Sequence, residues 1–288
     1  MLRELVSQNI FVFTSELYAQ VTSGAVITPA GAVVIDTLPF PSETNQILRF
    51  IEERLRVPVR FVINTHYHAD HVNGTSLFRR AQVISHRLCR ELLDGPGREA
   101  LDRARRNSRE MAALEMILPH VVFDEGIFNL HIGDVTLQMW HTPGHSLDSI
   151  VCMVKEERIL FAADTVMPVP FFADGSWTHY VKSLQGLREQ PFESVIQGHG
   201  EIVLRGEVEE KIDADIHYLV TLREKVERAL DRGLDLAGAV MSIDVESCGK
   251  SRIALGGLVG ELHRANVIAL YETLQKERGL EPDTAALS

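Results

Sequence analysis

Three histidines and one aspartate lie within six residues, directly after an apolar run that predicts a buried strand. They are His66, His68, Asp70 and His71, and the apolar run covers residues 60–65. Side chains two positions apart on an extended backbone point the same way, so His66 and His68 face one direction. After a turn, Asp70 and His71 reach the same cavity from its other side. Such nitrogen and oxygen ligands suit zinc and similar divalent ions, and two groups on adjacent walls indicate two metals rather than one.

Three later segments each end a predicted strand with a further candidate ligand. His145 follows a Pro-Gly turn, Asp164 ends an apolar run, and His199 lies between two glycines that let the backbone bend tightly. Taken alone, Asp164 predicts a turn or a helix cap. Because histidine or aspartate recurs at four strand ends, a shared site explains the pattern better than four separate structural roles.

The composition describes an ordinary globular chain. Of its 288 residues, 45% are hydrophobic and 24% are charged, which is enough to bury a large core. The formal net charge of -11 disfavours nucleic acid as a partner, because phosphate binding needs a positive surface. No run approaches the roughly 18 apolar residues of a membrane span, and the first residues do not resemble a signal peptide. We therefore expect a cytoplasmic protein with no membrane partner.

The order of predicted elements indicates two sheets packed face to face with helices outside. A mostly helical segment at residues 86–118 is long for a connection, and it is either a cover over the site or a plain surface hairpin. The other expected elements are strands between 10 and 38, a helix over 44–56, a short helix over 72–80, a strand over 82–85, strands between 121 and 162, a helix over 178–189 and a strand over 194–197.

The C-terminal part of the chain is predicted to be helical. Amphipathic helices are expected over residues 207–232 and 260–279. Their apolar stripes need a surface, which is either the sandwich of the same chain or a partner subunit. Because no linker rich in Pro, Gly or Ser precedes them, we expect two domains, 1–205 and a docked helical extension at 206–288. The alternative is a homodimer in which the apolar stripes of this tail are buried against a second copy of the chain.

These motifs together resemble the metallo-β-lactamase-fold superfamily of metal-dependent hydrolases. The resemblance covers about residues 10–205 and depends on the His-x-His-x-Asp-His cluster, the Thr-Pro-Gly-His turn, Asp164 and the Gly-His-Gly segment. It implies an α+β four-layer αββα sandwich with the metals at one edge. Carried over residue by residue, the implied ligands of one metal are His66, His68 and His145, those of the other are Asp70, His71 and His199, and Asp164 bridges the two.

The resemblance implies a dinuclear hydrolase that acts on a small molecule. Zinc is the expected metal, and manganese or iron also fits these residues. A hydroxide that bridges the ions would attack a carbonyl or phosphoryl centre, in an ester, thioester, lactone or phosphoester. Asp70 would accept a hydrogen bond from this nucleophile. Because true β-lactamases of this fold lack a carboxylate at the position of Asp164, we expect β-lactam cleavage at most as a side activity.

Two other functions stay open. One is a mononuclear iron enzyme that resembles persulfide dioxygenases, with His66, His145 and Asp164 as a two-histidine, one-carboxylate site. The other is a non-catalytic regulatory module that binds metal, which the complete ligand set disfavours. Within the family, Met167 counts against a typical lactonase, which carries tyrosine there, and His68 counts against flavodiiron proteins, which carry glutamate.

An aromatic loop after Asp164 is the expected wall of the substrate pocket. Residues 167–180 begin beside the metals and carry several large side chains. We expect His179 or Tyr180 to donate to a substrate oxygen. The alternative is that these aromatic side chains pack the loop onto the sandwich, and the same two alternatives apply to Tyr67. The expected pocket residues are Tyr67, Phe171, Phe172, Trp177, His179 and Tyr180.

Overall fold

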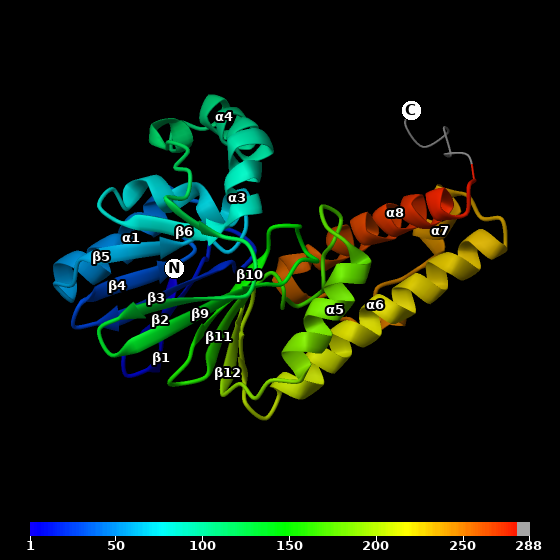
Figure 1. Cartoon of the computed structure of the whole chain (residues 1–288). Helices are drawn as coiled ribbons and strands as arrows, with labels where there is room; N and C mark the ends of the chain where they lie inside the picture. The colour runs from blue at the N-terminus through cyan, green and yellow to red at the C-terminus, as the bar shows by residue number, and fades with distance from the viewer. Residues whose placement is uncertain (281–288) are drawn as a thin grey trace.

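Two β-sheets lie face to face at the centre of the computed structural model, which describes residues 1–280 (Figure 1). The strands of the first sheet follow chain order, antiparallel up to β4 and parallel from β4 onward. Within the described residues these strands are β1 (Leu2–Ser7), β2 (Ile10–Thr14), β3 (Thr22–Thr28), β4 (Gly31–Ile35), β5 (Val59–Ile63), β6 (Gln82–His86) and β7 (Val121–Phe123).

The second sheet has the order β13-β12-β11-β10-β9-β8. Its neighbouring strands are antiparallel, except that β11 and β12 are parallel because α5 crosses over between them. The strands of this sheet in the described part of the chain are β8 (Ile127–Ile132), β9 (Val135–His141), β10 (Ile150–Val154), β11 (Ile159–Ala163), β12 (Ser194–Gln197) and β13 (Ile202–Leu204).

Apolar side chains from both sheets fill the space between them. Val33 and Ile63 of the first sheet belong to the same buried cluster as Leu137 and Phe161 of the second. All residues of β4 and of β11 are buried, as expected for strands that are covered on both faces.

Helices cover the outer face of each sheet, which confirms the four-layer αββα arrangement. On the first sheet, Ile47 and Ile51 pack against Val34 and Val62. On the second sheet, α5 and α6 form the outer layer. The α-helices of the described residues are α1 (Pro41–Arg49), α2 (Ala69–Val72), α3 (Arg87–Leu92), α4 (Arg98–Asn107), α5 (Trp177–Arg188), α6 (Val208–Asp231), α7 (Leu236–Ser242) and α8 (Val259–Glu277).

Several elements differ from those expected. The helix expected over 44–56 begins at Pro41, since proline is favoured in a first helical turn, and continues as a π-helical segment to Arg54. The helix expected over 72–80 is α2 followed by a 3-10 turn that ends at Leu77. Strands β1 and β13 and helix α7 were not predicted, because each is short or largely exposed and lacks a clear period.

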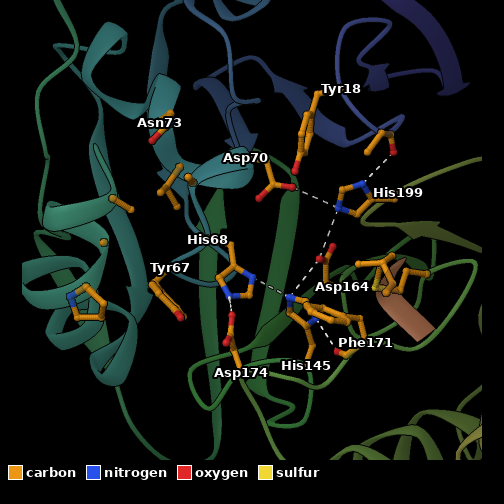
Figure 2. Close-up of a pocket in the computed structure, with 18 of the residues that line it drawn as sticks. Tyr18, Tyr67, His68, Asp70, Asn73, His145, Asp164, Phe171, Asp174 and His199 are labelled. Atoms are coloured by element: carbon orange, nitrogen blue, oxygen red, sulfur yellow. Dashed lines mark hydrogen bonds and ion pairs between the residues drawn. The ribbon is translucent and has the colours of Figure 1, made fainter. Parts of the chain in front are cut away.

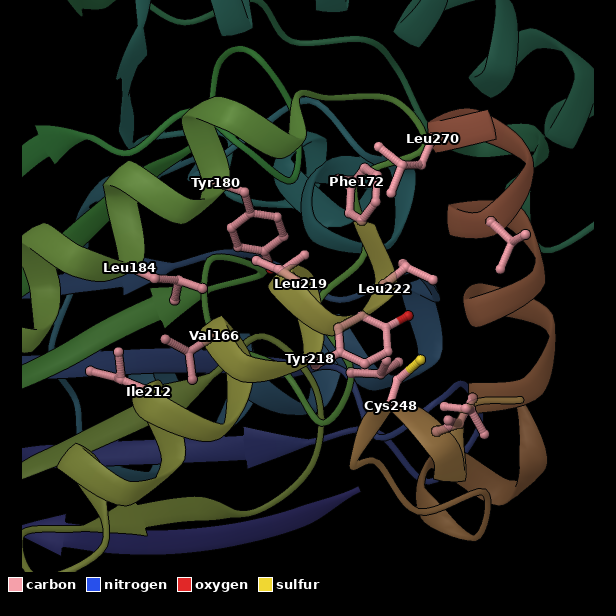
Figure 3. Packing of buried hydrophobic residues seen from close by; sticks show 14 of the residues in the cluster. Val166, Phe172, Tyr180, Leu184, Ile212, Tyr218, Leu219, Leu222, Cys248 and Leu270 are labelled. Carbon is pink, nitrogen blue, oxygen red and sulfur yellow. The ribbon is translucent and has the colours of Figure 1, made fainter. Parts of the chain in front are cut away.

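The C-terminal helices pack on the sandwich of the same chain. Figure 3 shows Tyr180 and Leu184 of α5 facing Leu219 of α6, and Leu270 of α8 next to Phe172. The same cluster includes Leu160 of β11, so the helices and the second sheet share one core. The division into domains at residue 205 and the homodimer stay predictions. No helix among residues 1–280 has both the length and the apolar character needed to cross a bilayer.

Candidate metal centre

The seven residues expected as metal ligands lie together at one edge of the two sheets (Figure 2). They come from the turn after β5, from α2, from the loop between β9 and β10, and from the ends of β11 and β12. A glycine is required beside one of them, because a Cβ at Gly198 would overlap the carboxylate of Asp164. The ligand atoms form two groups, each within 4.8 Å of one another: His66, His68, His145 and Asp164, and then Asp70, His71 and His199.

The first group converges on Oδ2 of Asp164. His145 Nε2 lies 3.2 Å from this oxygen, and His66 Nε2 lies 3.9 Å from it. His68 Nδ1 lies 2.8 Å from His145 Nε2. Atoms that bind one zinc ion at about 2.0–2.2 Å in tetrahedral geometry lie roughly 3.3–3.6 Å apart, so these spacings suit a single ion after shifts of about half an ångström.

The second group also lies beside the carboxylate of Asp164. His71 Nε2 lies 3.2 Å from Asp164 Oδ1, and His199 Nε2 lies 3.5 Å from Asp164 Oδ2. Asp70 Oδ2 lies 3.4 Å from His199 Nε2 and 3.9 Å from His71 Nε2. Asp164 therefore lies between the two groups and presents oxygen atoms to both.

Each of the five imidazoles has a polar group beside its outer nitrogen, which is a hydrogen-bond partner in four cases and a nearby carboxylate without a hydrogen bond for His68. His145 Nδ1 donates to Phe171 O at 2.8 Å, and His199 Nδ1 donates to Ala19 O at 2.9 Å. His68 Nε2 lies 3.3 Å from the carboxylate of Asp174. Such partners fix ring orientation and leave the inner nitrogen free to bind a metal. The inner Nε2 atoms of His66 and His71 and Oδ1 of Asp164 are buried without a hydrogen-bond partner, which fits a place for cations.

One buried carboxylate, Asp36, orients ligands from both groups. Its Oδ2 accepts from His71 Nδ1 at 2.9 Å and from Thr65 Oγ1 at 2.7 Å. Because Thr65 donates to Asp36, the hydroxyl accepts from His66 Nδ1, 3.0 Å away. Asp36 was not predicted as a site residue, although it follows the apolar run of β4 just as Asp164 follows that of β11.

We expect Asp36→Asn to weaken metal binding by about 10–100-fold, as changes to outer partners of ligands do. The amide would turn an N–H toward Thr65 or His71, both of which need an acceptor. Competition with a chromophoric chelator measures the affinity. Asp134→Asn, at an exposed turn, is the matched control. Equal affinities of the two variants would contradict the orienting role of Asp36.

The charges of the site favour cation binding. Burial alone would raise the pKa of Asp164, but His71 and His199 hold it well below its ordinary range. Burial lowers the pKa of His145 to about 4, so this ring is neutral at pH 7. Burial also opposes a charge on His199, but Asp164 and Asp70 outweigh it and raise the pKa to about 10. A cation that binds here would displace the proton of His199 and take over its pairing with the carboxylates.

A cavity of about 400 Å³ opens onto the ligands. Tyr67 and Phe171 line it, as expected from the sequence. Two distant segments complete its walls, namely the 86–118 insertion and the part of the helical extension where α8 begins. The insertion contributes Pro96, Ala100 and Arg103, and the extension contributes Leu255, Leu258 and Leu262. The insertion thus covers part of the site.

The structure corrects the other expected pocket residues, none of which is among the residues that line this cavity. Phe172 and Tyr180 are buried in the core with α6 and α8, and the Tyr180 hydroxyl donates to the main-chain oxygen of Asp164. Trp177 packs on the same core and donates to the main chain of α6. His179 is exposed on α5. The helical extension offers Phe172, Trp177 and Tyr180 an apolar surface, so these three rings pack the loop onto the core.

The extension also holds the loop that carries an outer partner of a ligand. Asn266 of α8 is fully buried, and its Oδ1 accepts from Phe172 N at 3.0 Å. Its Nδ2 donates to Pro170 O at 2.7 Å. Phe171, which accepts from His145, lies between these two anchored residues.

Known proteins share both the sequence pattern and the fold. Residues 18–199 match the family model described as the metallo-beta-lactamase superfamily. The "Beta-lactamase-like protein 2 homolog" of Caenorhabditis elegans is 26% identical over 219 residues, which are 76% of this chain and 66% of the relative. The cytoplasmic isozyme of hydroxyacylglutathione hydrolase from Saccharomyces cerevisiae is 26% identical over 131 residues, which are 44% of this chain and 41% of the relative.

A solved structure extends the likeness in fold to the C-terminal helices. The sec-alkylsulfatase Pisa1 from Pseudomonas sp. superimposes with a TM-score of 0.76 at 16% identity and covers 99% of this chain, which corresponds to 51% of the Pisa1 chain. The chain therefore spans about half to two thirds of the length of the first relatives and of this neighbour. The family model matches well over half of the described residues, and the chain belongs to the metallo-β-lactamase superfamily.

Proposed function

We propose that the protein is a dinuclear metal-dependent hydrolase of small molecules. The observation that carries this proposal is the position of the Asp164 carboxylate between the two groups. Its Oδ2 lies 3.2 Å from His145 Nε2 of the first group, and its Oδ1 lies 3.2 Å from His71 Nε2 of the second. A mononuclear site would need only one of these groups. Two divalent ions held here, zinc by default and manganese or iron otherwise, would activate a water molecule at neutral pH and polarise the substrate.

The side chains around the ions have separate roles in this proposal. Both ligand carboxylates line the cavity, and Asp70 is the more exposed, at 21% against 5% for Asp164. In this proposal Asp70 therefore accepts a hydrogen bond from the attacking water. Asp36 and Phe171 O hold the ligand rings in position. The cavity of about 400 Å³ lies in the usual range of about 300–1,000 Å³ for small-molecule pockets.

The proposed substrates are esters, thioesters, lactones and phosphoesters, with β-lactams at most a side activity. The yeast relative is named for hydrolysis of a hydroxyacylglutathione, so that compound is the first thioester to test. A cytoplasmic location without a nucleic-acid or membrane partner is part of the same proposal.

Metal content and a substrate panel test the proposal together. After supplementation with zinc, manganese or iron, we expect close to two ions per chain by elemental analysis. Each form is then assayed with esters, thioesters, lactones, phosphodiesters, phosphotriesters and β-lactams. Failure to bind any ion would refute the dinuclear hydrolase. One iron per chain with oxygen consumption on glutathione persulfide would favour the dioxygenase instead.

A further inference from the structure

Tyr18, which was not among the predicted pocket residues, lies over the candidate metal ligands. It belongs to the connection between β2 and β3 and lines the cavity. Figure 2 shows its ring above Asp70 and His199, with the hydroxyl end directed toward Asp70. The residue keeps 45% of its surface exposed, so the ring is not there to fill the core.

The connection that carries Tyr18 is fixed at several points. Ser15 Oγ accepts from Tyr18 N at 3.0 Å, and Tyr18 O accepts from Val21 N at 3.0 Å. Ser15 Oγ in turn donates to Glu43 Oε2 at 2.6 Å. Glu43 is 1% exposed at the start of α1, so the main chain of Tyr18 is tied to the interior.

The turn after Tyr18 joins it to the second ligand group. Ala19 and Gln20 have φ values of 43° and 51°, in the left-handed region that non-glycine residues rarely adopt. This turn directs Ala19 O to His199 Nδ1 and Gln20 O to Gly200 N, both at 2.9 Å. Unfavourable backbone of this kind persists where the surroundings hold it, often at functional sites.

The geometry points to the Tyr18 hydroxyl as a catalytic group that donates a hydrogen bond to a substrate oxygen as that oxygen gains negative charge. A phenol has an ordinary pKa of about 10, so it is a donor at neutral pH. The ligand carboxylates around it only accept. Tyr67, the other phenol in the lining, lies beside His68 on the opposite side of the site (Figure 2).

This inference rests on the proposed hydrolysis, and it adds no reactant. The water oxygen forms the new bond to carbon or phosphorus, and the bond to the leaving group breaks. One proton of the water passes to the leaving group. Tyr18 keeps its own proton and stabilises charge on the oxygen, as donors in an oxyanion hole do. Tyr18 would therefore act on substrates that have a carbonyl or phosphoryl oxygen to accept its hydrogen bond.

Tyr18→Phe tests this role, since it removes only the hydroxyl. We expect kcat/KM to fall about 100-fold on the best ester or phosphoester, with metal content and melting temperature unchanged. An unesterified alkylphosphonate is a tetrahedral anion with no ester bond to hydrolyse. It should bind about 10-fold more weakly in calorimetry, by the loss of one charge-assisted hydrogen bond. Leu17→Ala, at an exposed neighbour outside the cavity lining, is the matched control and should behave as the wild type.

Two failures can be told apart. If wild-type protein hydrolyses no substrate of the panel, the proposed function fails. If it is active, and Tyr18→Phe keeps both its kcat/KM and its affinity for the phosphonate, only the role of Tyr18 is wrong. Loss of metal from Tyr18→Phe in proportion to its loss of activity would also overturn the catalytic role, because the hydroxyl would then act on the site and not on the substrate.

Discussion

His199→Ala is expected to lose mainly the second metal ion, and His66→Ala is expected to impair the first. Each variant should lower kcat by about a thousandfold, because a metal ion contributes several kcal/mol to transition-state stabilisation and about 1.4 kcal/mol corresponds to a factor of ten. Both rings are almost fully buried and belong to different groups, so each change removes one ligand and leaves the other group complete.

Elemental analysis at fixed free metal and steady-state kinetics measure the two effects. His131→Ala is the matched control, because His131 is exposed and its Nδ1 lies 3.1 Å from Thr136 Oγ1 on β9, away from the ligands. Two ions bound in either ligand variant, together with full activity, would show that the ligand assignment is wrong. Loss of both ions from both variants would mean that the two groups bind cooperatively through Asp164.

The clustering of the seven candidate ligands was predictable because their chemistry and their positions in the chain agree. His66, His145, Asp164 and His199 each follow an apolar strand, and the ends of such strands meet at one edge of a sandwich. Asp36 follows the same rule, yet it has no histidine or glycine beside it to form a recognisable motif. A carboxylate directly after a fully buried strand was the available signal.

The substrate pocket was less predictable because its walls come from distant segments. The aromatic residues after Asp164 have the composition of a pocket wall. Whether Phe172 and Trp177 face the cavity depends on where the helical extension packs, and no local pattern gives that position. Tyr18 was missed for the same reason, since only the pairing of its loop with the segment around His199 places it over the ligands.

The second large expected effect is a loss of folding stability when Asn266, in the helical extension, is replaced by alanine. Asn266→Ala would leave Phe172 N and Pro170 O buried without their partner. It would also remove a donor to the Tyr218 hydroxyl, 3.1 Å away. Unpaired buried groups cost about 1–3 kcal/mol, so we expect a loss of about 3 kcal/mol. For a chain of this size that corresponds to roughly 6–12 °C in Tm, measured by calorimetry on the metal-free protein.

The same variant should also weaken the first metal, because Phe171 O would no longer be held against His145. We expect about a 10-fold loss of affinity in chelator competition, at the low end for an outer partner of a ligand. Asn107→Ala, at the exposed end of α4, controls for loss of an asparagine. Asn266→Asp separates the two bonds, since it keeps the acceptor for Phe172 N and loses the donor to Pro170 O. If Asn266→Ala lowers Tm but leaves metal affinity unchanged, the extension supports the fold without positioning His145. If both fall, the helices outside the family match are part of the metal site.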